Sequence, residues 1–230
     1  FEGHSVSNPR WSGQIEQDKL VFQLLGNKRN GYFIELAAND AIYLSNSFAL
    51  EQYYGWNGIC AEGNPSYWYW LAFRKCQVVG AMAGRSKGEK VQVSFAGGGE
   101  TGGIVGHPAI RGGYNAPSSK SVESRLTTTL VEILEMLEAP QVIDYLSLDV
   151  EGAEEHIMNG FDFEKYTFAV MTIERPSQNL LALLQNNGYQ HVKTLDQSFG
   201  ESLWKHSSTV LHNEIQVLQA WCAVGKKCAA

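Results

Sequence analysis

Short apolar runs alternate with helix-length segments along most of the chain. Before residue 83, expected strands at residues 31–36, 57–62 and 77–82 are separated by expected helices at residues 45–55 and 65–75. The alternation of strands and helices resumes after residue 127. The expected helices are at residues 128–139, 154–160 and 177–188, and the expected strands are at residues 142–150, 168–174 and 189–195. Strands separated by helices of this length are typical of βαβ units. The sequence therefore predicts an α/β fold with a mostly parallel sheet.

We expect a single domain over residues 1–230, because no shift in composition marks a boundary. An N-terminal extension, residues 1–30, contains a short amphipathic segment that predicts a helix at residues 17–25. A glycine-rich insertion, residues 96–120, follows an expected strand at residues 91–95. It has too few periodic apolar residues for a core of its own, so it is either disordered or ordered over a site.

The first residue and the C-terminal tail each suggest a feature of the protein. The first residue is Phe1 instead of a methionine, so we expect a targeting segment to have been removed, which is compatible with a secretory or organellar location. The C-terminal tail, residues 213–230, overlaps an apolar run at residues 208–224 that we expect to supply a final antiparallel strand. No run reaches the roughly 18 consecutive apolar residues that a membrane-spanning helix needs.

The charge balance restricts the kind of partner. The formal net charge is −6, from 18 basic and 24 acidic residues. Proteins that bind the phosphates of nucleic acids usually present a basic face, so we do not expect a nucleic acid as the partner.

The four cysteines are too few and too scattered for a disulfide framework. Cys60 and Cys76 lie in or beside apolar runs, so we expect them to be small buried thiols. Cys222 and Cys228 lie close together in the tail and either pair in an oxidising compartment or remain free thiols.

Acidic residues close four of the expected strands. They are Glu35, Glu62, Asp149 with the nearby Glu151, and Glu174. In an open parallel sheet the carboxyl ends of the strands lie at one edge, where ligands bind. Any one of these acids could simply cap the following helix. Four strands that end this way at one edge instead predict a binding site.

The turn after the first strand indicates what that site binds. Residues 35–41, ELAANDA, contain no glycine, whereas a turn that holds a pyrophosphate uses several. S-adenosylmethionine has no phosphate, and its ammonium and sulfonium groups favour acids such as Glu35 and Asp40. Its carboxylate can be held by backbone N–H groups or by Ser45 and Asn46.

Glu62 is placed to bind the ribose of such a cofactor. An acid that ends the second strand, some 25 residues after the first turn, accepts hydrogen bonds from a ribose diol in dinucleotide and S-adenosylmethionine sites. We therefore assign Glu62 to the cofactor.

From about Ser12 to Trp204, the chain resembles the FkbM family of methyltransferases. The resemblance rests on residues 31–65, 143–163, 171–176, 188–195 and 200–204, and its most specific element is the hexad DVEGAE, Asp149 to Glu154. The sequence EGNP at residues 62–65 resembles the EPNP motif of the family.

The resemblance implies a class I methyltransferase, or Rossmann-like, fold. This is a three-layer sandwich whose seven-stranded sheet is mostly parallel and has an antiparallel last strand. It also implies S-adenosylmethionine as methyl donor and O-methylation of a hydroxyl on a sugar, glycan or small metabolite. The implied cofactor-binding residues are Glu35, Ala37, Asn39, Asp40, Ser45, Asn46, Glu62, Asn64, Ala81, Met82 and Asp149.

Three positions depart from the family pattern. Ala37 and Ala41 stand where many relatives have glycine, as in a eukaryotic-type branch with an AAND turn, and Gly63 stands where many have proline. An alanine forced to positive φ would cost about 1–2 kcal/mol, whereas one at negative φ would cost nothing.

The acceptor hydroxyl needs a base to take its proton. Asp149 is our first candidate, Glu174 the second and His107 the third, and Glu151 is expected to face the acceptor. Asp149, Glu151 and Glu174 could instead hold Mg²⁺ or Ca²⁺. Because no histidine or cysteine lies at a matching spacing, we predict no metal ligand.

Two other classes of function remain open from the sequence. The chain could be a catalytically silent methyltransferase-like domain that binds or assembles within a larger complex, since fold does not fix function. An NAD-dependent enzyme is disfavoured by the turn without glycine.

Overall fold

A seven-stranded sheet forms the centre of the molecule, in the order β10-β11-β9-β8-β1-β2-β3. The computed structural model describes residues 8–95, 102–107, 110, 122–196 and 200–223. The strands are β1 (Tyr32–Leu36), β2 (Asn57–Ala61), β3 (Gln77–Val79), β8 (Val142–Leu148), β9 (Thr167–Glu174), β10 (Tyr189–Asp196) and β11 (Glu201–His206). β11 runs antiparallel to both of its neighbours, β9 and β10, and all other pairs in this sheet are parallel. The predicted mostly parallel sheet with an antiparallel last strand is confirmed.

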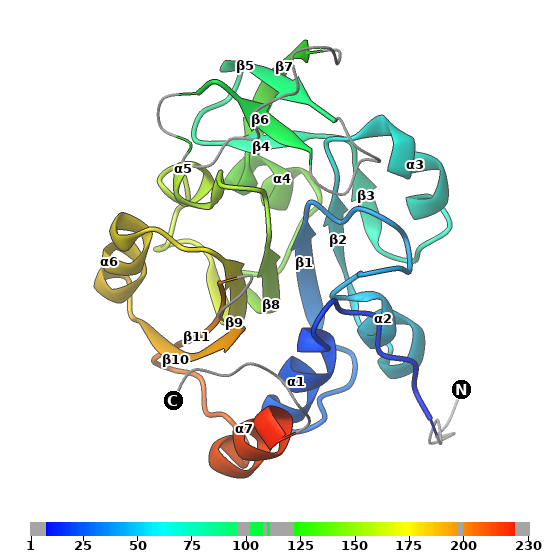
Figure 1. Cartoon of the computed structure of the whole chain (residues 1–230), viewed down its shortest axis with the longest axis vertical. Helices are drawn as coiled ribbons and strands as arrows, with labels where there is room; N and C mark the ends of the chain where they lie inside the picture. Colours follow the sequence, from blue (N-terminus) through cyan, green and yellow to red (C-terminus); the bar gives the residue numbers. More distant parts are fainter. Residues whose placement is uncertain (1–7, 96–101, 108–109, 111–121, 197–199, 224–230) are drawn as a thin grey trace.

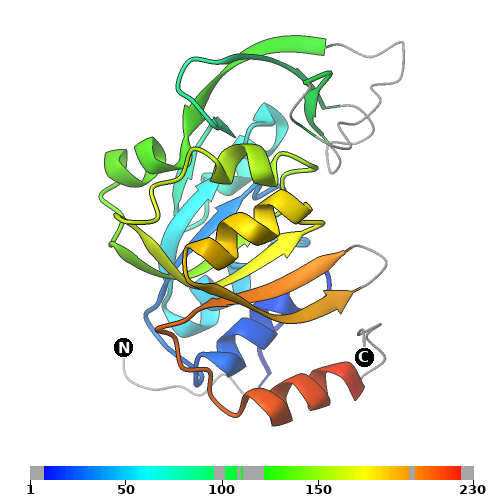
Figure 2. The ribbon, with the colours of Figure 1, turned by 90° about the vertical axis from the view of Figure 1, so that its left-hand side faces the viewer.

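Helices cover both faces of this sheet, as Figures 1 and 2 show. One layer holds α1 (Gln17–Leu24), α2 (Phe48–Tyr54), α3 (Pro65–Leu71) and α7 (Glu214–Ala223), and the other holds α4 (Leu130–Met136), α5 (Glu154–Met158) and α6 (Gln178–Asn186). Side chains of successive residues in β1 point to opposite helix layers. Phe33 lies in the same core cluster as Leu50 of α2, and Ile34 lies in the cluster that includes Leu184 of α6. The three-layer sandwich is therefore the class I arrangement that the resemblance implies.

A second, four-stranded sheet lies beyond the carboxyl ends of the parallel strands (Figure 1). Its order is β4-β7-β5-β6, with β4 (Met82–Gly84), β5 (Lys90–Ser94), β6 (Gly103–Val105) and β7 (Val122–Thr129). The sequence pattern did not predict this sheet. The single strand expected at residues 77–82 is divided between the two sheets, and part of the glycine-rich insertion is ordered as β6. The rest of the insertion, except residues 102, 106, 107 and 110, lies outside the described residues.

The helix expected from residue 128 begins at Leu130, because Thr129 caps it. The Thr129 side chain accepts the N–H of Glu132, and the Glu132 carboxylate accepts the N–H of Thr129. This reciprocal pair satisfies two backbone donors at the helix start. The preceding residues therefore remain extended and pair with β5.

The expected strand at residues 208–224 is wrong. Its second half forms α7, and the final antiparallel strand is the preceding β11. Val217, Leu218 and Trp221 are spaced three and four residues apart, which is a helical period, and they pack into the core beside α1. Among the described residues, no helix has the length and apolar character to cross a bilayer.

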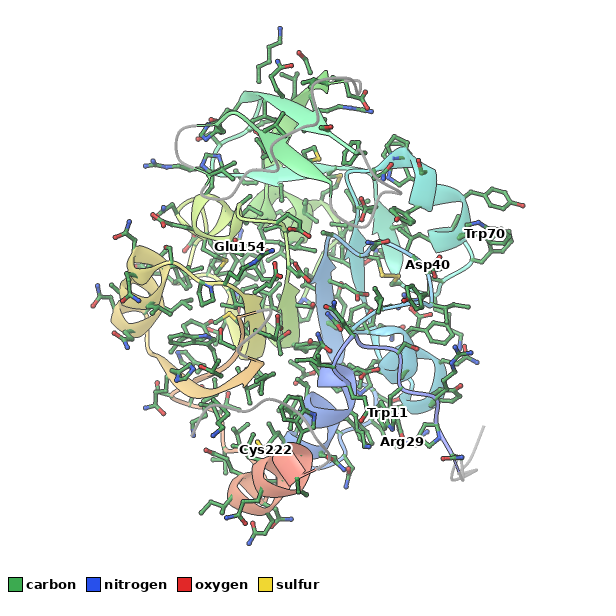
Figure 3. All side chains as sticks on the ribbon, in the orientation of Figure 1. Trp11, Arg29, Asp40, Trp70, Glu154 and Cys222 are labelled. Carbon is green, nitrogen blue, oxygen red and sulfur yellow. A yellow bond between two sulfur atoms is a disulfide. The ribbon has the colours of Figure 1, made fainter. Side chains whose placement is uncertain are left out.

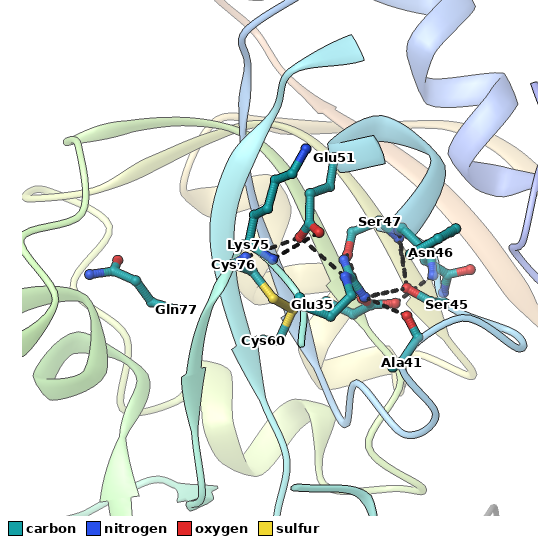
Figure 4. Close-up of a disulfide and its surroundings, with 12 residues drawn as sticks. Glu35, Ala41, Ser45, Asn46, Ser47, Glu51, Cys60, Lys75, Cys76 and Gln77 are labelled. Atoms are coloured by element: carbon teal, nitrogen blue, oxygen red, sulfur yellow. Dashed lines mark hydrogen bonds and ion pairs between the residues drawn. A yellow bond between two sulfur atoms is a disulfide. The ribbon is translucent and has the colours of Figure 1, made fainter. Parts of the chain in front are cut away.

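The expectation of free thiols at Cys60 and Cys76 is also wrong. Both are buried as predicted, but they form a disulfide that joins β2 to the segment just before β3 (Figure 4). The two strands are adjacent and parallel, so the two Cα atoms lie 6.1 Å apart, within the range that a disulfide spans. Cys222 on α7 (labelled in Figure 3) is disulfide-bonded as well, and Cys228 lies outside the described residues.

Replacing both Cys60 and Cys76 with alanine is expected to lower the free energy of unfolding by about 3 kcal/mol. The cysteines are 16 residues apart, and closing a loop of about 15 residues in the unfolded chain is worth roughly that amount. Urea denaturation of the two proteins measures the difference. Adding a reductant to the double variant measures the separate contribution of the disulfide that involves Cys222. If the double variant and the unaltered protein are equally stable without reductant, the prediction is wrong.

Candidate active site

The acids predicted to converge do lie at one edge of the large sheet. Pairing of Leu36 with Leu148, and of Leu148 with Ile173, brings the ends of β1, β8 and β9 level with one another. Side chains alternate between the faces of a strand. Glu35 and Glu174 therefore point to the layer of α1 and α2.

A pocket opens between this edge and the small sheet. It encloses roughly 480 Å³ not filled by protein atoms, part of it open to solvent. Its walls are mainly apolar and come from both sheets and from α5: Leu36, Ala37, Ala61, Glu62, Gly63, Ala81, Met82, Ala83, Phe95, Gly102, Gly103, Ile104, Val150, Ala153 and Ile157. We call it the edge pocket. Of the predicted cofactor residues, Ala37, Glu62, Ala81 and Met82 line it.

Glu62 is the acidic residue in the wall of the edge pocket. Its carboxylate accepts the backbone N–H groups of Asn39, at 2.8 Å, and Asn64, at 2.6 Å. Burial raises the pKa of Glu62, and these two hydrogen bonds lower it in part. A carboxylate has about four acceptor positions, so Glu62 can hold both turns and still accept hydroxyl groups of a ligand.

The segment after β2 is closely packed around Glu62. A Cβ added to Gly63 would lie 2.1 Å from the sulfur of Met82, so the glycine found in place of the family proline makes room for that side chain. Asn64 accepts the N–H of Ser66 and caps α3. On the same helix, the Trp68 indole donates to the backbone oxygen of Glu62 at 2.9 Å, whereas Trp70 points outward (Figure 3).

The turn after β1 carries strain at one of the two alanines. Ala37 has φ of 55° and Asn39 also has φ of 55°, whereas Ala41 does not lie in the left-handed region. Alanine at such a φ costs about 1–2 kcal/mol. The Asp40 carboxylate accepts the N–H groups of Ile42 and Tyr43, which closes the turn.

Positive φ recurs at two more turns of the same edge. Glu151, after β8, has φ of 56°, and Arg175, after β9, has φ of 44°. Strained backbone of this kind persists where the surrounding structure enforces it, and it clusters at functional sites. The strain at three strand ends therefore supports this edge as the site.

Beneath the turn, Glu35 belongs to a buried network with Ser45, Asn46 and Ser47, which Figure 4 labels, and Arg74 supplies the cation of this network. The Glu35 carboxylate accepts the hydroxyls of Ser45 and Ser47 and the N–H of Asn46. The Arg74 guanidinium lies 4.0 Å from Glu35 and donates to Ser45 and Ser47. Burial raises the pKa of Glu35, which the charge of Arg74 opposes.

The Arg74 guanidinium also reaches the turn itself. It donates to the backbone oxygen of Ala41 at 3.0 Å and lies 3.1 Å from the carboxylate of Glu51. Arg74 therefore ties the ELAANDA turn to the start of α2. The sequence reasoning did not single out Arg74, because its partners are distant in the chain.

Asn46 carries a buried polar atom that has no hydrogen-bond partner among the described residues. Its amide nitrogen donates to the Ser147 hydroxyl at 2.9 Å. Its side-chain oxygen is buried and accepts no hydrogen bond from the residues that the structure describes. A buried acceptor without a donor is costly, so a bound ligand with an N–H group would stabilise it.

A second group of carboxylates, the acidic cluster, surrounds Asp149: Glu151, Glu174 and Glu201. Burial, followed by the charge of Glu174, raises the pKa of Asp149 well above its ordinary value. Burial raises the pKa of Glu201 to about 8. Arg175 balances part of this charge, with its guanidinium 3.0 Å from Glu151 and 2.6 Å from Glu174.

Glu201 was missed from the sequence. It is the first residue of β11 and pairs with Glu174, the last residue of β9. An antiparallel strand presents its first residue, not its last, at the carboxyl edge of its parallel neighbours. Glu154, in the same hexad as Asp149, instead accepts the N–H groups of Val150 and Gly152, and burial raises its pKa to about 7.

His107, the third candidate base, follows β6 and is not part of the edge-pocket wall. It lies beside Glu89 and His156 instead. The structure thus brings Asp149, Glu151 and Glu174 together and places His107 in a separate group.

The sheet order is that of the class I methyltransferase fold, and the edge pocket and the acidic cluster lie at the carboxyl edge of its strands. The chain belongs to the methyltransferase FkbM domain family, whose model matches residues 35–191, more than half of the chain. None of the curated proteins compared with the chain matches it. A solved precorrin-6y C5,15-methyltransferase from Geobacter metallireducens GS-15 is similar over 90% of this chain and 94% of that chain, with a TM-score of 0.46 and 11% sequence identity.

Proposed function

We propose that this protein uses S-adenosylmethionine to methylate a hydroxyl group on a sugar, glycan or small metabolite. The observation that carries the proposal is the edge pocket, in which one acid, Glu62, lies among apolar walls at the carboxyl end of β2. This is where an S-adenosylmethionine ribose is bound in folds of this class.

The residues present fit this cofactor at both of its ends. Glu62 would accept the ribose hydroxyls, and Ala81 and Met82 offer apolar contacts for the adenine. At the other end, the unpartnered oxygen of Asn46 would accept the ammonium group. Glu35 and Ser45 act through the Arg74 network that holds Asn46, and are not expected to touch the cofactor themselves.

The bound cofactor would supply an electrophilic methyl group beside the acidic cluster. The acceptor hydroxyl would have to give up its proton to a base that this chain supplies. Asp149 would take that proton, since its raised pKa makes its carboxylate a stronger base than an ordinary one. Glu174 and Glu151, held by Arg175, would orient the acceptor.

Calorimetric titration with S-adenosylmethionine and S-adenosylhomocysteine tests the proposal. Replacing Glu62 with glutamine is expected to weaken binding of both at least about tenfold, because a hydrogen bond to a charged group is worth about 1.5–3 kcal/mol. Glutamine keeps an acceptor oxygen for one of the two turns, whose N–H groups bond to different carboxylate oxygens, and thermal unfolding of the variant reports whether it remains folded.

The matched control is Glu135→Gln on α4, whose side chain is exposed and pairs with Lys165. It should bind both compounds like the unaltered protein. If the unaltered, folded protein binds neither compound at millimolar concentration, the proposal is wrong and the silent binding subunit is the better description.

We also propose that the protein works in an oxidising compartment. Disulfides are rare in reducing cytosol and persist in secreted or organellar proteins. The Cys60–Cys76 bond and the bonded state of Cys222 support this location.

A further inference from the structure

Three potential metal ligands meet outside the active site. They are Glu89, which precedes β5, His107, which follows β6, and His156 on α5. The Nε2 atom of His107 lies 3.0 Å from one carboxylate oxygen of Glu89, and that of His156 lies 3.0 Å from the other. One ligand atom from each residue lies within 4.8 Å of the other two. We propose that these residues form a binding site for a divalent first-row metal, Zn²⁺ above all.

The ligand types and their spacing favour zinc. Two imidazoles and one carboxylate are a common zinc ligand set, with bonds of about 2.0–2.2 Å to nitrogen and oxygen. Tetrahedral ligands at that bond length are about 3.3–3.5 Å apart, so small side-chain rotations would close the three residues around an ion. The fourth position is left for water. Magnesium prefers oxygen ligands in octahedral geometry and fits this group poorly.

The backbone positions of Glu89 and His156 are held before any metal binds. The Glu89 carbonyl accepts the N–H of Thr127 in β7 at 3.0 Å, which fixes the approach to β5. His156 is buried on α5, and the neighbouring Ile157 lines the edge pocket. A site with fixed backbone loses little entropy on binding a metal.

The site lies where the small sheet meets the main domain. Glu89 and His107 flank strands β5 and β6 of the small sheet, and His156 belongs to α5, which lies next to that sheet in Figure 1. At the same junction, a Cβ on Gly160 would lie 2.1 Å from the backbone oxygen of Arg85. A bound ion would therefore hold the small sheet against α5. Gly103 and Ile104, which line the edge pocket, belong to that sheet.

The acidic cluster is a weaker candidate for a metal. The Arg175 guanidinium already lies within 3.0 Å of Glu151 and Glu174. A metal there would have to displace a cation that the fold supplies, whereas Glu89 faces two imidazoles that are neutral when they bind a metal.

Zinc titration of the whole chain, first stripped with EDTA, tests the inference. We expect one Zn²⁺ per chain by elemental analysis after dialysis, and a rise in melting temperature with added zinc, because an ion that binds only the folded state stabilises it. Millimolar Mg²⁺ should produce neither effect.

Two variants identify the ligands. Glu89→Gln is nearly isosteric and should unfold like the unaltered protein in EDTA, and His107→Ala removes a partly buried ligand in the segment after β6. Each should weaken zinc binding at least about tenfold, since even the partners of metal ligands are worth 10–100-fold in affinity. His191→Ala, a histidine on β10 that packs against Trp204, is the control and should keep full affinity. Absence of zinc from the folded, unaltered chain, or undiminished affinity in both ligand variants, would overturn the inference.

Discussion

Replacing Arg74 with alanine is expected to lower the free energy of unfolding by about 3–5 kcal/mol, the usual cost of removing one partner of a buried ion pair. Arg74, Glu35 and Glu51 are all buried. Without the guanidinium, two carboxylates would remain in the interior without a cation. The backbone oxygen of Ala41 would also lose its donor. Urea denaturation at neutral pH measures the loss.

A second set of variants tests whether the unbalanced charges of Glu35 and Glu51 cause the loss of stability in Arg74→Ala. A triple variant, Arg74→Met with Glu35→Gln and Glu51→Gln, removes the unbalanced charges and should regain part of the lost stability, because neutral groups of similar shape are often tolerated in such sites. Arg29→Ala, an exposed arginine (labelled in Figure 3), should change stability by less than about 1 kcal/mol. An Arg74→Ala protein as stable as the Arg29→Ala protein would show that the network is not a stabilising element.

Replacing Asp149 with asparagine is expected to lower turnover about 10²–10⁴-fold, the range that general bases contribute, with little change in S-adenosylmethionine affinity. Transfer of a radiolabelled methyl group to a panel of hydroxyl-bearing sugars measures the first effect and calorimetry the second. Glu174→Gln should reduce turnover less. Unchanged turnover in Asp149→Asn would remove Asp149 from the role of base.

The Asp149→Asn variant should also differ from the unaltered protein in how its stability depends on pH, and this measurement does not require a methyl acceptor. The pKa of Asp149 is raised in the folded protein above its ordinary value of about 3.9. The proton is therefore bound more tightly when the chain is folded, and the stability it contributes is present below about pH 4 and is lost as pH rises through the folded pKa. Asparagine does not ionise, so the stability of Asp149→Asn relative to the unaltered protein should rise as the pH increases above about 4. A difference in stability that does not change with pH would contradict the raised pKa of Asp149.

Much of the main fold was predictable from local pattern. Apolar runs such as residues 31–36 and 142–150 become strands because βαβ units leave them buried on both faces, and the acids that follow them converge for topological reasons alone. Strand β7 was not predictable in this way. Its sequence, VESRLTTT, is mostly polar and unpatterned, and it is extended because β5 supplies the hydrogen bonds of its ladder.

The candidate site was predictable only where chemistry coincides with a strand end. Glu62 and Asp149 could be named because each follows a recognisable apolar run. Arg74 could not, since Glu35 and Glu51, which give it a role, are 39 and 23 residues away in the chain. The group of Glu89, His107 and His156 has no motif for the same reason: three separate elements supply it.

The position of Trp68 gives this protein an optical reporter. Its half-buried indole is bonded to the backbone of Glu62, and a Cβ on the neighbouring Gly80 would contact the ring. The emission of an indole depends on the polarity and motion of its surroundings, and those of Trp68 are the strand ends that line the edge pocket. With the other five tryptophans of the chain's six replaced by phenylalanine, fluorescence would follow ligands as they enter and leave, at protein concentrations far below those that calorimetry requires.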